Sequence, residues 1–361
     1  MSAARHLREG FTTGTAATAA AMAALELLLT GHAPEAVSVP LPPFDGAAPR
    51  GHLTVAVLET RAVRDEARAV VQKDGGDDPD ATCHAHIEAV VSLTSAPQVV
   101  IEGGAGVGRV TLPGLPVPVG EAAINPAPRQ QITAGVRNIA AKHGYTGGVR
   151  VLIQVRDGEM LARHTFNPRL GIVGGISILG TQGTVKPFSH AAWKATIIQG
   201  LEVAAATGCD TICLSTGRRS ERLLIGRYPS LPAQAFVQAA DFARFSLREA
   251  ARRPFTTLVW GCFFGKLIKL AQGHACTHAR DARLDMVDLS RQAAGAGAAC
   301  AEAVGRCITA GHALELLLAD PRGTAVLRDM ARRAADTAAG FAGKPVRIHF
   351  FHLNGTELLH L

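Results

Sequence analysis

The sequence predicts two domains, an N-terminal α+β domain over residues 1–165 and a C-terminal α/β domain over residues 166–361. A chain of 361 residues is long enough for two domains of ordinary size. In the first part, strand-like and helical stretches are segregated, which is typical of α+β folds. In the second part, short apolar strands alternate with helices, which favours a parallel or mixed sheet. Neither part carries the glycine fingerprint of a classical Rossmann domain.

The N-terminal domain is expected to begin with an alanine-rich helix that follows Thr12–Thr15 and ends near Thr30, where Gly31 supplies a stop. A proline-rich loop is expected over residues 34–49. Alternating apolar residues then predict strands, and we expect a hairpin around the glycines of residues 103–108. The expected elements are strands over 53–57, 67–72, 86–93 and 149–155, hairpin strands over 98–102 and 109–112, and a helix over 126–143.

The C-terminal domain is expected to start with a glycine-rich stretch. Strands and helices then alternate, in the order helix 189–207, strand 211–214, helix 232–251, strand 255–260, a helix from Gly265, helices across 289–340 and a closing strand over 346–353.

Composition limits the classes of partner and the compartment. The net charge of +7 favours acidic partners, but the positive charges are dispersed, whereas a nucleic-acid reader concentrates them on one element. We therefore expect no nucleic-acid partner. The seven cysteines have irregular spacing and no secretory leader is visible, which predicts a cytoplasmic protein without disulfides. The longest apolar run, residues 16–29, is interrupted and short, so no membrane partner is expected.

An acidic segment, KDGGDDPDAT at residues 73–82, is the first candidate for chemistry. Its four carboxylates lie within seven residues and repel one another, so they need a cation, a lysine or solvent nearby. A solvated turn is one interpretation, because aspartate and glycine favour turns. Calcium is disfavoured, because the ligand spacing is wrong and the closing glutamate is absent.

A glycine-rich segment, GIVGGISILGTQGT at residues 171–184, is the second candidate. Dense glycines let backbone N–H groups approach a ligand closely, and a following helix would direct its positive end at that ligand. The alternative is a tightly packed turn with no ligand.

Two further glycine segments are set aside as nucleotide loops. Residues 103–108 precede a strand and not a helix, and residues 261–267 are one residue short of a phosphate-binding loop. The second segment still places Lys266 and Lys269 on one helix face, where they favour anions. The cysteine and histidines that follow have spacing atypical of zinc modules, so no metal site is expected.

These segments together resemble the CbiD family. The resemblance rests on FTTGT at residues 11–15, KDGGDDPDAT at 73–82, GIVGGISILGT at 171–181, and GKLIKLAQG at 265–273 followed by Thr277–His278 and Arg283. These four ordered matches span about residues 8 to 285. The departures are Ala16 where the family often has cysteine, Phe263 where a histidine is expected, and Ala279 where a serine is usual.

The resemblance implies S-adenosylmethionine-dependent methylation of C1 of cobalt-precorrin-5B, which gives cobalt-precorrin-6A in cobalamin biosynthesis. It also implies a fold other than that of a classical Rossmann methyltransferase. A non-catalytic corrinoid carrier of the same pathway and a metal-free precorrin substrate are the alternatives. The expected partner is a small tetrapyrrole, and a homo-oligomer and transient contacts with neighbouring pathway enzymes stay open.

The resemblance and the residue chemistry together predict roles for three sets of residues. The acidic loop is expected to face the reaction, through Asp74, Asp77 and Asp78. The methyl donor is expected to bind Thr12, Thr13, Gly14, Gly171, Gly174, Gly175, Gly180, Thr181 and Gly183. The carboxylates that rim the tetrapyrrole are expected to bind Lys73, Lys266, Lys269, Thr277, His278, Arg280 and Arg283, because charge-assisted hydrogen bonds to carboxylates are strong.

Overall fold

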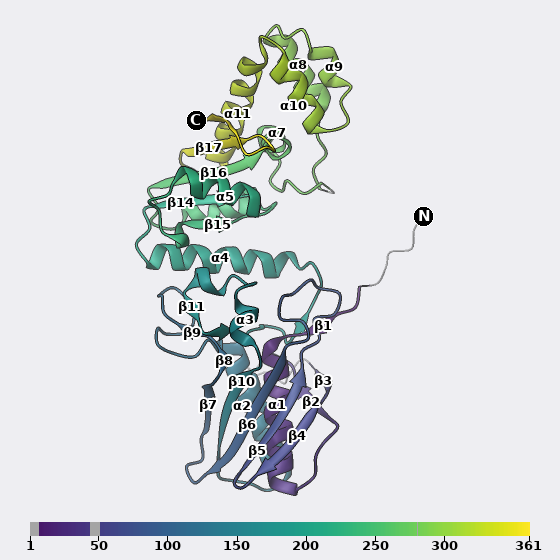
Figure 1. Cartoon of the computed structure of the whole chain (residues 1–361), viewed down its shortest axis with the longest axis vertical. Coiled ribbons are helices and arrows are strands. Elements are labelled where there is room, and N and C mark those ends of the chain that lie inside the picture. The colour runs from purple at the N-terminus through teal and green to yellow at the C-terminus, as the bar shows by residue number, and fades with distance from the viewer. Residues whose placement is uncertain (1–6, 44–50, 280) are drawn as a thin grey trace. The chain divides into compact units, whose positions relative to one another are not determined.

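A computed structural model describes residues 7–43, 51–279 and 281–361 of the chain. The chain divides into two units, Met1–His190 and Ala191–Leu361, each with its own hydrophobic core (Figure 1). The domain boundary expected between residues 165 and 166 falls inside the first unit and stays a prediction. The mixed architecture confirms the predicted combination of an α+β part and an α/β part.

A five-stranded sheet with the order β4-β5-β6-β10-β7 forms the centre of the first unit. Helices α1 and α2 pack against each other, and α1 contacts β5 and β6 of this sheet (Figure 1). The elements are α1 (Thr13–Thr30), β2 (Ala36–Pro40), β3 (His52–Ala56), β4 (Glu59–Val63), β5 (Glu66–Gln72), β6 (His86–Thr94), β7 (Val99–Gly103), α2 (Pro126–Lys142), β10 (Gly148–Val155) and α3 (Gly158–Ala162).

Helix α1 begins and ends where the sequence predicts. The hydroxyl of Thr12 accepts a hydrogen bond from the backbone N–H of Thr15 at 3.2 Å, which caps the first turn. Gly31 adopts the left-handed conformation at the other end. Within the described ranges, α1 is the helix whose length and hydropathy would suffice to cross a membrane. It is longer than the apolar run at residues 16–29 suggested, and 78% of it is buried in the first unit's core.

Short two-stranded pairs connect distant segments of the first unit. They are β1 (Gly10–Phe11) with β13 (Thr184–Val185), β9 (Arg109–Val110) with β11 (Ile172–Val173), and β8 (Gly106–Val107) with β12 (Gly175–Ile176). The hairpin predicted around residues 103–108 is therefore wrong, because β7 pairs with β10 and β9 pairs with β11. The loop predicted over residues 34–49 contains strand β2, and residues 44–50 lie outside the described ranges.

The second unit is built on a sheet with the order β15-β14-β16-β17-β18, in which only the pair β17–β18 is antiparallel. This confirms the predicted parallel or mixed sheet. Its elements are α4 (His190–Ala206), β14 (Thr211–Ser215), α5 (Arg218–Arg227), β15 (Phe236–Gln238), α6 (Ala243–Ala251), β16 (Thr257–Phe263), α7 (Phe264–Ala271), α8 (Met286–Gly295), α9 (Ala301–Gly305), α10 (Ala310–Ala319), α11 (Gly323–Ala342), β17 (Val346–Phe351) and β18 (Glu357–His360).

The path of the chain through this sheet reverses next to β14. The chain runs from β14 through α5 to β15 on one side, then through α6 to β16 on the other side of β14. Right-handed crossovers place α5 and α6 on opposite faces of the sheet. One long helix predicted over residues 232–251 is wrong, because this range contains a 3-10 turn (Ala233–Ala235), β15 and α6.

Candidate functional site

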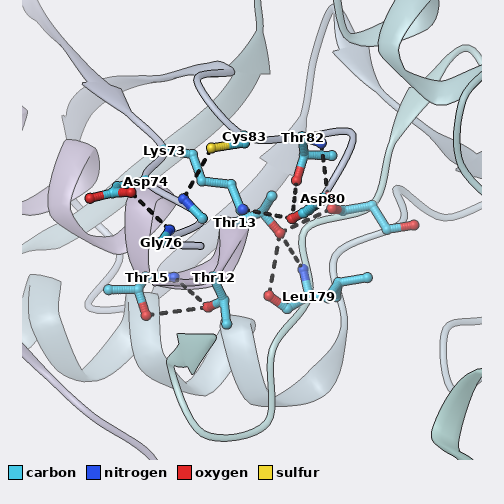
Figure 2. Close-up of polar contacts among 12 residues, drawn as sticks. Thr12, Thr13, Thr15, Lys73, Asp74, Gly76, Asp80, Thr82, Cys83 and Leu179 are labelled. Atoms are coloured by element: carbon cyan, nitrogen blue, oxygen red, sulfur yellow. Dashed lines mark hydrogen bonds and ion pairs between the residues drawn. The ribbon is translucent and has the colours of Figure 1, made fainter. Parts of the chain in front are cut away.

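In the first unit, the turn before α1 and the glycine-rich segment lie side by side. The backbone N–H of Thr12 donates to the carbonyl of Gly183 at 3.0 Å, and the Thr15 hydroxyl donates to the same carbonyl at 2.8 Å. The Thr13 hydroxyl accepts from the N–H of Leu179 at 2.9 Å (Figure 2). These contacts join two of the segments expected to bind the methyl donor, although they are about 165 residues apart in the sequence.

The acidic loop is packed against the same turn. The N–H of Phe11 donates to the carbonyl of Asp74 at 2.8 Å. Gly76 has a φ of 65°, and a Cβ at this position would lie 2.2 Å from the carbonyl oxygen of Arg8, so only glycine fits. Three segments that are separate in the sequence therefore form one feature, which we call the loop junction: residues 8–15, 73–82 and 171–184.

Each aspartate expected to face the reaction has a protein partner in the loop junction. Arg8 binds both carboxylate oxygens of Asp74, which lowers the pKa of that carboxyl below its ordinary value. Asp77 accepts from the backbone N–H of Arg8 at 2.7 Å, and Asp78 accepts from the N–H of Phe188 at 2.9 Å. Asp77 is exposed and Asp74 and Asp78 are partly exposed, so all three keep faces open to solvent.

Lys73 occupies a different place from the one its expected role requires. Its side chain is 2% exposed, and its ammonium group binds a carboxylate oxygen of Asp80 at 2.6 Å (Figure 2). Thr82 donates to Asp80 from both its N–H and its hydroxyl, at 2.8 Å each. Burial opposes ionisation of Asp80, but Lys73 and Thr82 outweigh it and hold the pKa of Asp80 below its ordinary value. The ammonium group of Lys73 therefore faces inward, toward Asp80, and not toward solvent. A substrate contact by Lys73 stays a prediction.

Few of the residues expected to bind the donor are open to solvent. Gly174 and Thr181 are exposed and Gly180 is partly exposed. A Cβ at Gly180 would meet the side chain of Thr12 at 2.4 Å, so part of the glycine content serves close packing. The remaining members are buried: Thr12, Thr13, Gly14, Gly171, Gly175 and Gly183. Donor contacts at the surface would therefore be made mainly by residues 174 and 180–181.

A cavity of about 560 Å³ lies in the second unit, at the carboxyl ends of β14 and β16. The loop after β14 and the first turn of α5 form one wall, and the end of β16 with α7 forms another. The lining residues are Thr216, Gly217, Arg218, Arg219, Ser220, Phe263, Gly265, Lys266, Lys269, Ala279 and Leu284. The predicted residues Lys266 and Lys269 are therefore brought together in one concave site.

The two lysines share one acceptor at the cavity, the carbonyl of Thr277. Lys266 is paired with the carboxylate of Asp241 and donates to the carbonyl of Thr277 at 3.0 Å. Lys269 donates to the same carbonyl at 2.9 Å and is buried. Burial, and next to it the charge of Lys266, lowers the pKa of Lys269. The buried Thr277 also donates its hydroxyl to Asp241 at 3.0 Å.

The remaining predicted substrate residues do not line the cavity. Thr277 contributes its carbonyl behind the lysines, His278 is partly buried next to it, and Arg283 is exposed outside the cavity. Arg280 lies outside the described residues. Their contacts with a tetrapyrrole stay predictions.

Sequence reasoning missed Arg218 and Arg219, which it treated only as dispersed positive charge. The signal that identifies them is their position, because they follow a short apolar strand and Gly217 and open a helix. In a parallel sheet, that position lies at the carboxyl edge, where ligands bind.

Comparisons with known proteins agree with the predicted resemblance. The family described as CbiD matches residues 1–187, and the family described as CbiD, C-terminal domain, matches residues 276–360. Relatives named cobalt-precorrin-5B C(1)-methyltransferase include one from Nitratidesulfovibrio vulgaris, 57% identical over 98% of this chain and 92% of that protein. Another, from Burkholderia orbicola, is 47% identical over 91% of this chain and 90% of that protein.

A relative of the same name from Geobacillus kaustophilus is 48% identical over 82% of this chain and 78% of that protein. A crystal structure of a cobalamin biosynthesis protein (cbiD) from Archaeoglobus fulgidus is 31% identical, covers 72% of this chain and 78% of that chain, and has a TM-score of 0.39. With one family matching more than half of the chain and relatives of up to 57% identity over nearly all of it, the chain belongs to the CbiD family.

Proposed function

We propose that this protein transfers the methyl group of S-adenosylmethionine to C1 of cobalt-precorrin-5B. The observation that carries the proposal is the identity of 57%, over 98% of the chain, with a protein named for this reaction. The geometry supports it, because the chain has one site rich in carboxylates and another rich in cations. A sulfonium donor and a polycarboxylate acceptor need sites of these opposite kinds.

The loop junction fits the donor chemically. S-adenosylmethionine supplies an electrophilic methyl carbon on a positively charged sulfur. Asp77 is an exposed carboxylate, and Gly174 leaves its backbone open, since a Cβ there would meet nothing within 4 Å. We assign donor binding to the exposed groups of Asp77, Gly174, Gly180 and Thr181. The buried contacts of Thr12, Thr13 and Thr15 position residues 179–183.

The chain's part in the reaction is positioning. The bond between the methyl carbon and sulfur breaks with its electron pair left on sulfur. An electron pair of the ring at C1 forms the new bond to the methyl carbon, and the positive charge of the sulfonium passes to the macrocycle. Holding the two reacting carbons at near-attack distance accelerates such a displacement without an acid or a base. Lys266 and Lys269 anchor the acceptor through its carboxylates.

The test of the proposal combines a donor-binding measurement and an assay. S-adenosylhomocysteine, at a hundredfold excess over its dissociation constant, should stabilise the protein by about 2.7 kcal/mol, whereas ATP and NAD should not. With cobalt-precorrin-5B and S-adenosylmethionine, mass spectrometry should detect an acceptor heavier by one methyl group. If the protein binds the tetrapyrrole but transfers no methyl group, it is a carrier and not an enzyme. A metal-free acceptor, assayed in parallel, decides whether cobalt is required.

A variant pair tests the carboxylate at the donor site. Asp77→Asn keeps the shape of the side chain and its acceptor for the N–H of Arg8, but it removes the charge. We expect roughly tenfold weaker binding of S-adenosylmethionine, because a charge-assisted contact contributes on the order of 1.5 kcal/mol. Asp65→Asn, in the exposed turn between β4 and β5, is the matched control. If the two variants bind S-adenosylmethionine with equal affinity, the donor does not bind at Asp77.

A further inference from the structure

The cavity of the second unit lies where the chain reverses direction through its sheet. Strands β14 and β16 are parallel neighbours, and their successors α5 and α7 both start at the carboxyl edge. The chain leaves β14 toward β15 and returns to β16 on the other side. Ligands of open α/β sheets bind at such a reversal, because the two loops diverge and leave a crevice.

The described lining of this cavity is strongly cationic. It contains Arg218, Arg219, Lys266 and Lys269 and no carboxylate. Asp241, which does not line the cavity, is paired with Lys266. The first turns of α5 and α7 add their partial positive charge, and α5 has no side-chain cap on its first N–H groups. A dense positive field in a concave site favours an anion and disfavours a sulfonium.

The lysines keep unused hydrogen-bonding capacity. An ammonium group has three donors. Lys269 uses one of them on the carbonyl of Thr277, and its side chain is buried, with 7% of the residue exposed. A buried cation with spare donors that lines a cavity is stabilised by an anion bound there.

The two arginines of α5 differ in their contacts. Arg219 donates to the carbonyl of Leu353 at 2.6 Å and lies over the ring of Phe263, 5.4 Å from its centroid. The side chain of Arg218 is exposed, lines the cavity, and has no hydrogen bond or ion pair within the described parts of the chain. A guanidinium group in this position is available for a two-pronged contact with a carboxylate.

We infer that this cavity is a subsite for the carboxylate arms of the tetrapyrrole, with Arg218 as a specificity-determining residue opposite Lys266 and Lys269. The identity of the ligand rests on the proposed function. The methylene part of an arm would pack on Phe263 and Leu284, which also line the cavity. The volume of about 560 Å³ suits arms and one edge of a macrocycle.

The experiment uses the purified full chain and uroporphyrin III, a fluorescent tetrapyrrole with four acetate and four propionate arms. Arg218→Ala should weaken uroporphyrin binding roughly tenfold, because one charge-assisted contact is lost, and Arg218→Glu should weaken it further. Arg222→Ala is the matched control, since Arg222 is exposed on the same helix and does not line the cavity. It should bind uroporphyrin as the unmodified protein does.

Two outcomes would overturn the inference. If the unmodified protein and both Arg218 variants bind uroporphyrin with equal affinity, the carboxylate arms do not bind in this cavity. Competitive displacement of uroporphyrin by millimolar inorganic phosphate or ATP, together with a melting shift caused by the displacing compound, would make the cavity a phosphate site.

Methyl transfer, measured on the same variants, separates this inference from the proposed function. Arg218→Ala should raise KM for the precorrin roughly tenfold and leave kcat unchanged, because an anchor that holds an arm and not the reacting carbon contributes equally to ground and transition states. If Arg218→Ala transfers methyl groups with an unchanged KM, the subsite is ruled out and the proposed reaction stands. If uroporphyrin binds through Arg218 but the protein transfers no methyl group, the proposed reaction is ruled out and the subsite stands.

Discussion

The loop junction of the first unit and the cavity of the second unit treat their charges in opposite ways. In the junction, Asp74 is bound by Arg8 and Asp80 by the buried Lys73. In the cavity, the side chain of Arg218 has no partner in the described parts of the chain. The two lysines share the carbonyl of Thr277, and Lys266 also pairs with Asp241. The acidic motif at residues 73–82 therefore uses much of its charge within its own fold, whereas the cavity keeps the charge of Arg218 available for a ligand.

This difference shows that a segment rich in motif residues need not be the one that leaves charged groups available to a ligand. Aspartates and glycines of the junction hold three distant segments together, and they leave Asp77 and Gly174 exposed. The cavity is not marked by dense glycines, and its anion preference comes from four cationic side chains, the strand order and two helix starts. Three changes test how far this contrast holds.

The largest expected effect comes from breaking the internal neutralisation of the junction. Lys73→Met leaves Asp80, only 28% exposed at its side chain, without its cation. Removal of one partner from a buried ion pair costs about 3 kcal/mol, and urea unfolding followed by circular dichroism should show a loss of that order. Lys142→Met is the control, because Lys142 pairs with Glu26 on the surface and should lose less than about 1 kcal/mol.

The double variant Lys73→Met with Asp80→Asn checks the cause. It should recover part of the loss, because no buried charge is left without a partner. If Lys73→Met and Lys142→Met lose equal free energy of unfolding, the Lys73–Asp80 pair is no more shielded from solvent than a surface ion pair.

A smaller effect is expected where the junction's segments touch. Gly76→Ala places a Cβ 2.2 Å from the carbonyl oxygen of Arg8 at a φ of 65°. The expected loss of unfolding free energy is about 2 kcal/mol, part of it steric and part of it backbone strain. Gly31→Ala has a similar φ of 73° but meets nothing within 4 Å, so it should lose only about 1 kcal/mol. If the two variants are equally stable, the close approach of residues 8 and 76 does not exist in solution.

The sequence predicted those parts of the fold that depend on local pattern. Helix α1 follows from its alanine run, the Thr12 cap and Gly31, and the alternation of strands and helices in the second unit predicted its sheet. Pairing between distant strands was not predictable, because β7 finds its partner in β10, about 50 residues later. The edge strand β4 was missed, since its residues are mostly exposed and carry no apolar alternation.

The candidate sites follow the same division. The motifs of the junction were recognised, but the burial of Lys73 depends on Asp80 and on the packing around both, which a sequence pattern does not contain. Arg218 and Arg219 were missed because their significance comes from the reversal of the chain next to β14. A local motif describes what a segment can do, and the fold decides which of its groups stay available.

The smallest expected effect concerns a neutralised cluster in the second unit, which shows that this unit also contains satisfied charges. His349 is buried, with its ring nitrogens 2.6 Å from a carboxylate oxygen of Glu357 and 2.8 Å from the hydroxyl of Tyr228. Arg227 also binds Glu357, at 2.8 Å, and His360 lies 3.7 Å from it. Burial lowers the pKa of His349 despite the opposing effect of Glu357.

Because the folded pKa of His349 lies below the unfolded value, the unfolded chain binds more protons between the two values. The free energy of unfolding should therefore be complete above about pH 6.5 and fall as the pH drops below it, by no more than about 1.4 kcal/mol per pH unit. His349→Gln should flatten this slope in urea titrations at pH 5, 6 and 7. His360→Gln, at a side chain that is 65% exposed, should keep it. A slope that survives in His349→Gln would place the titrating group elsewhere in the chain, and His349 would then not be the source of this pH dependence.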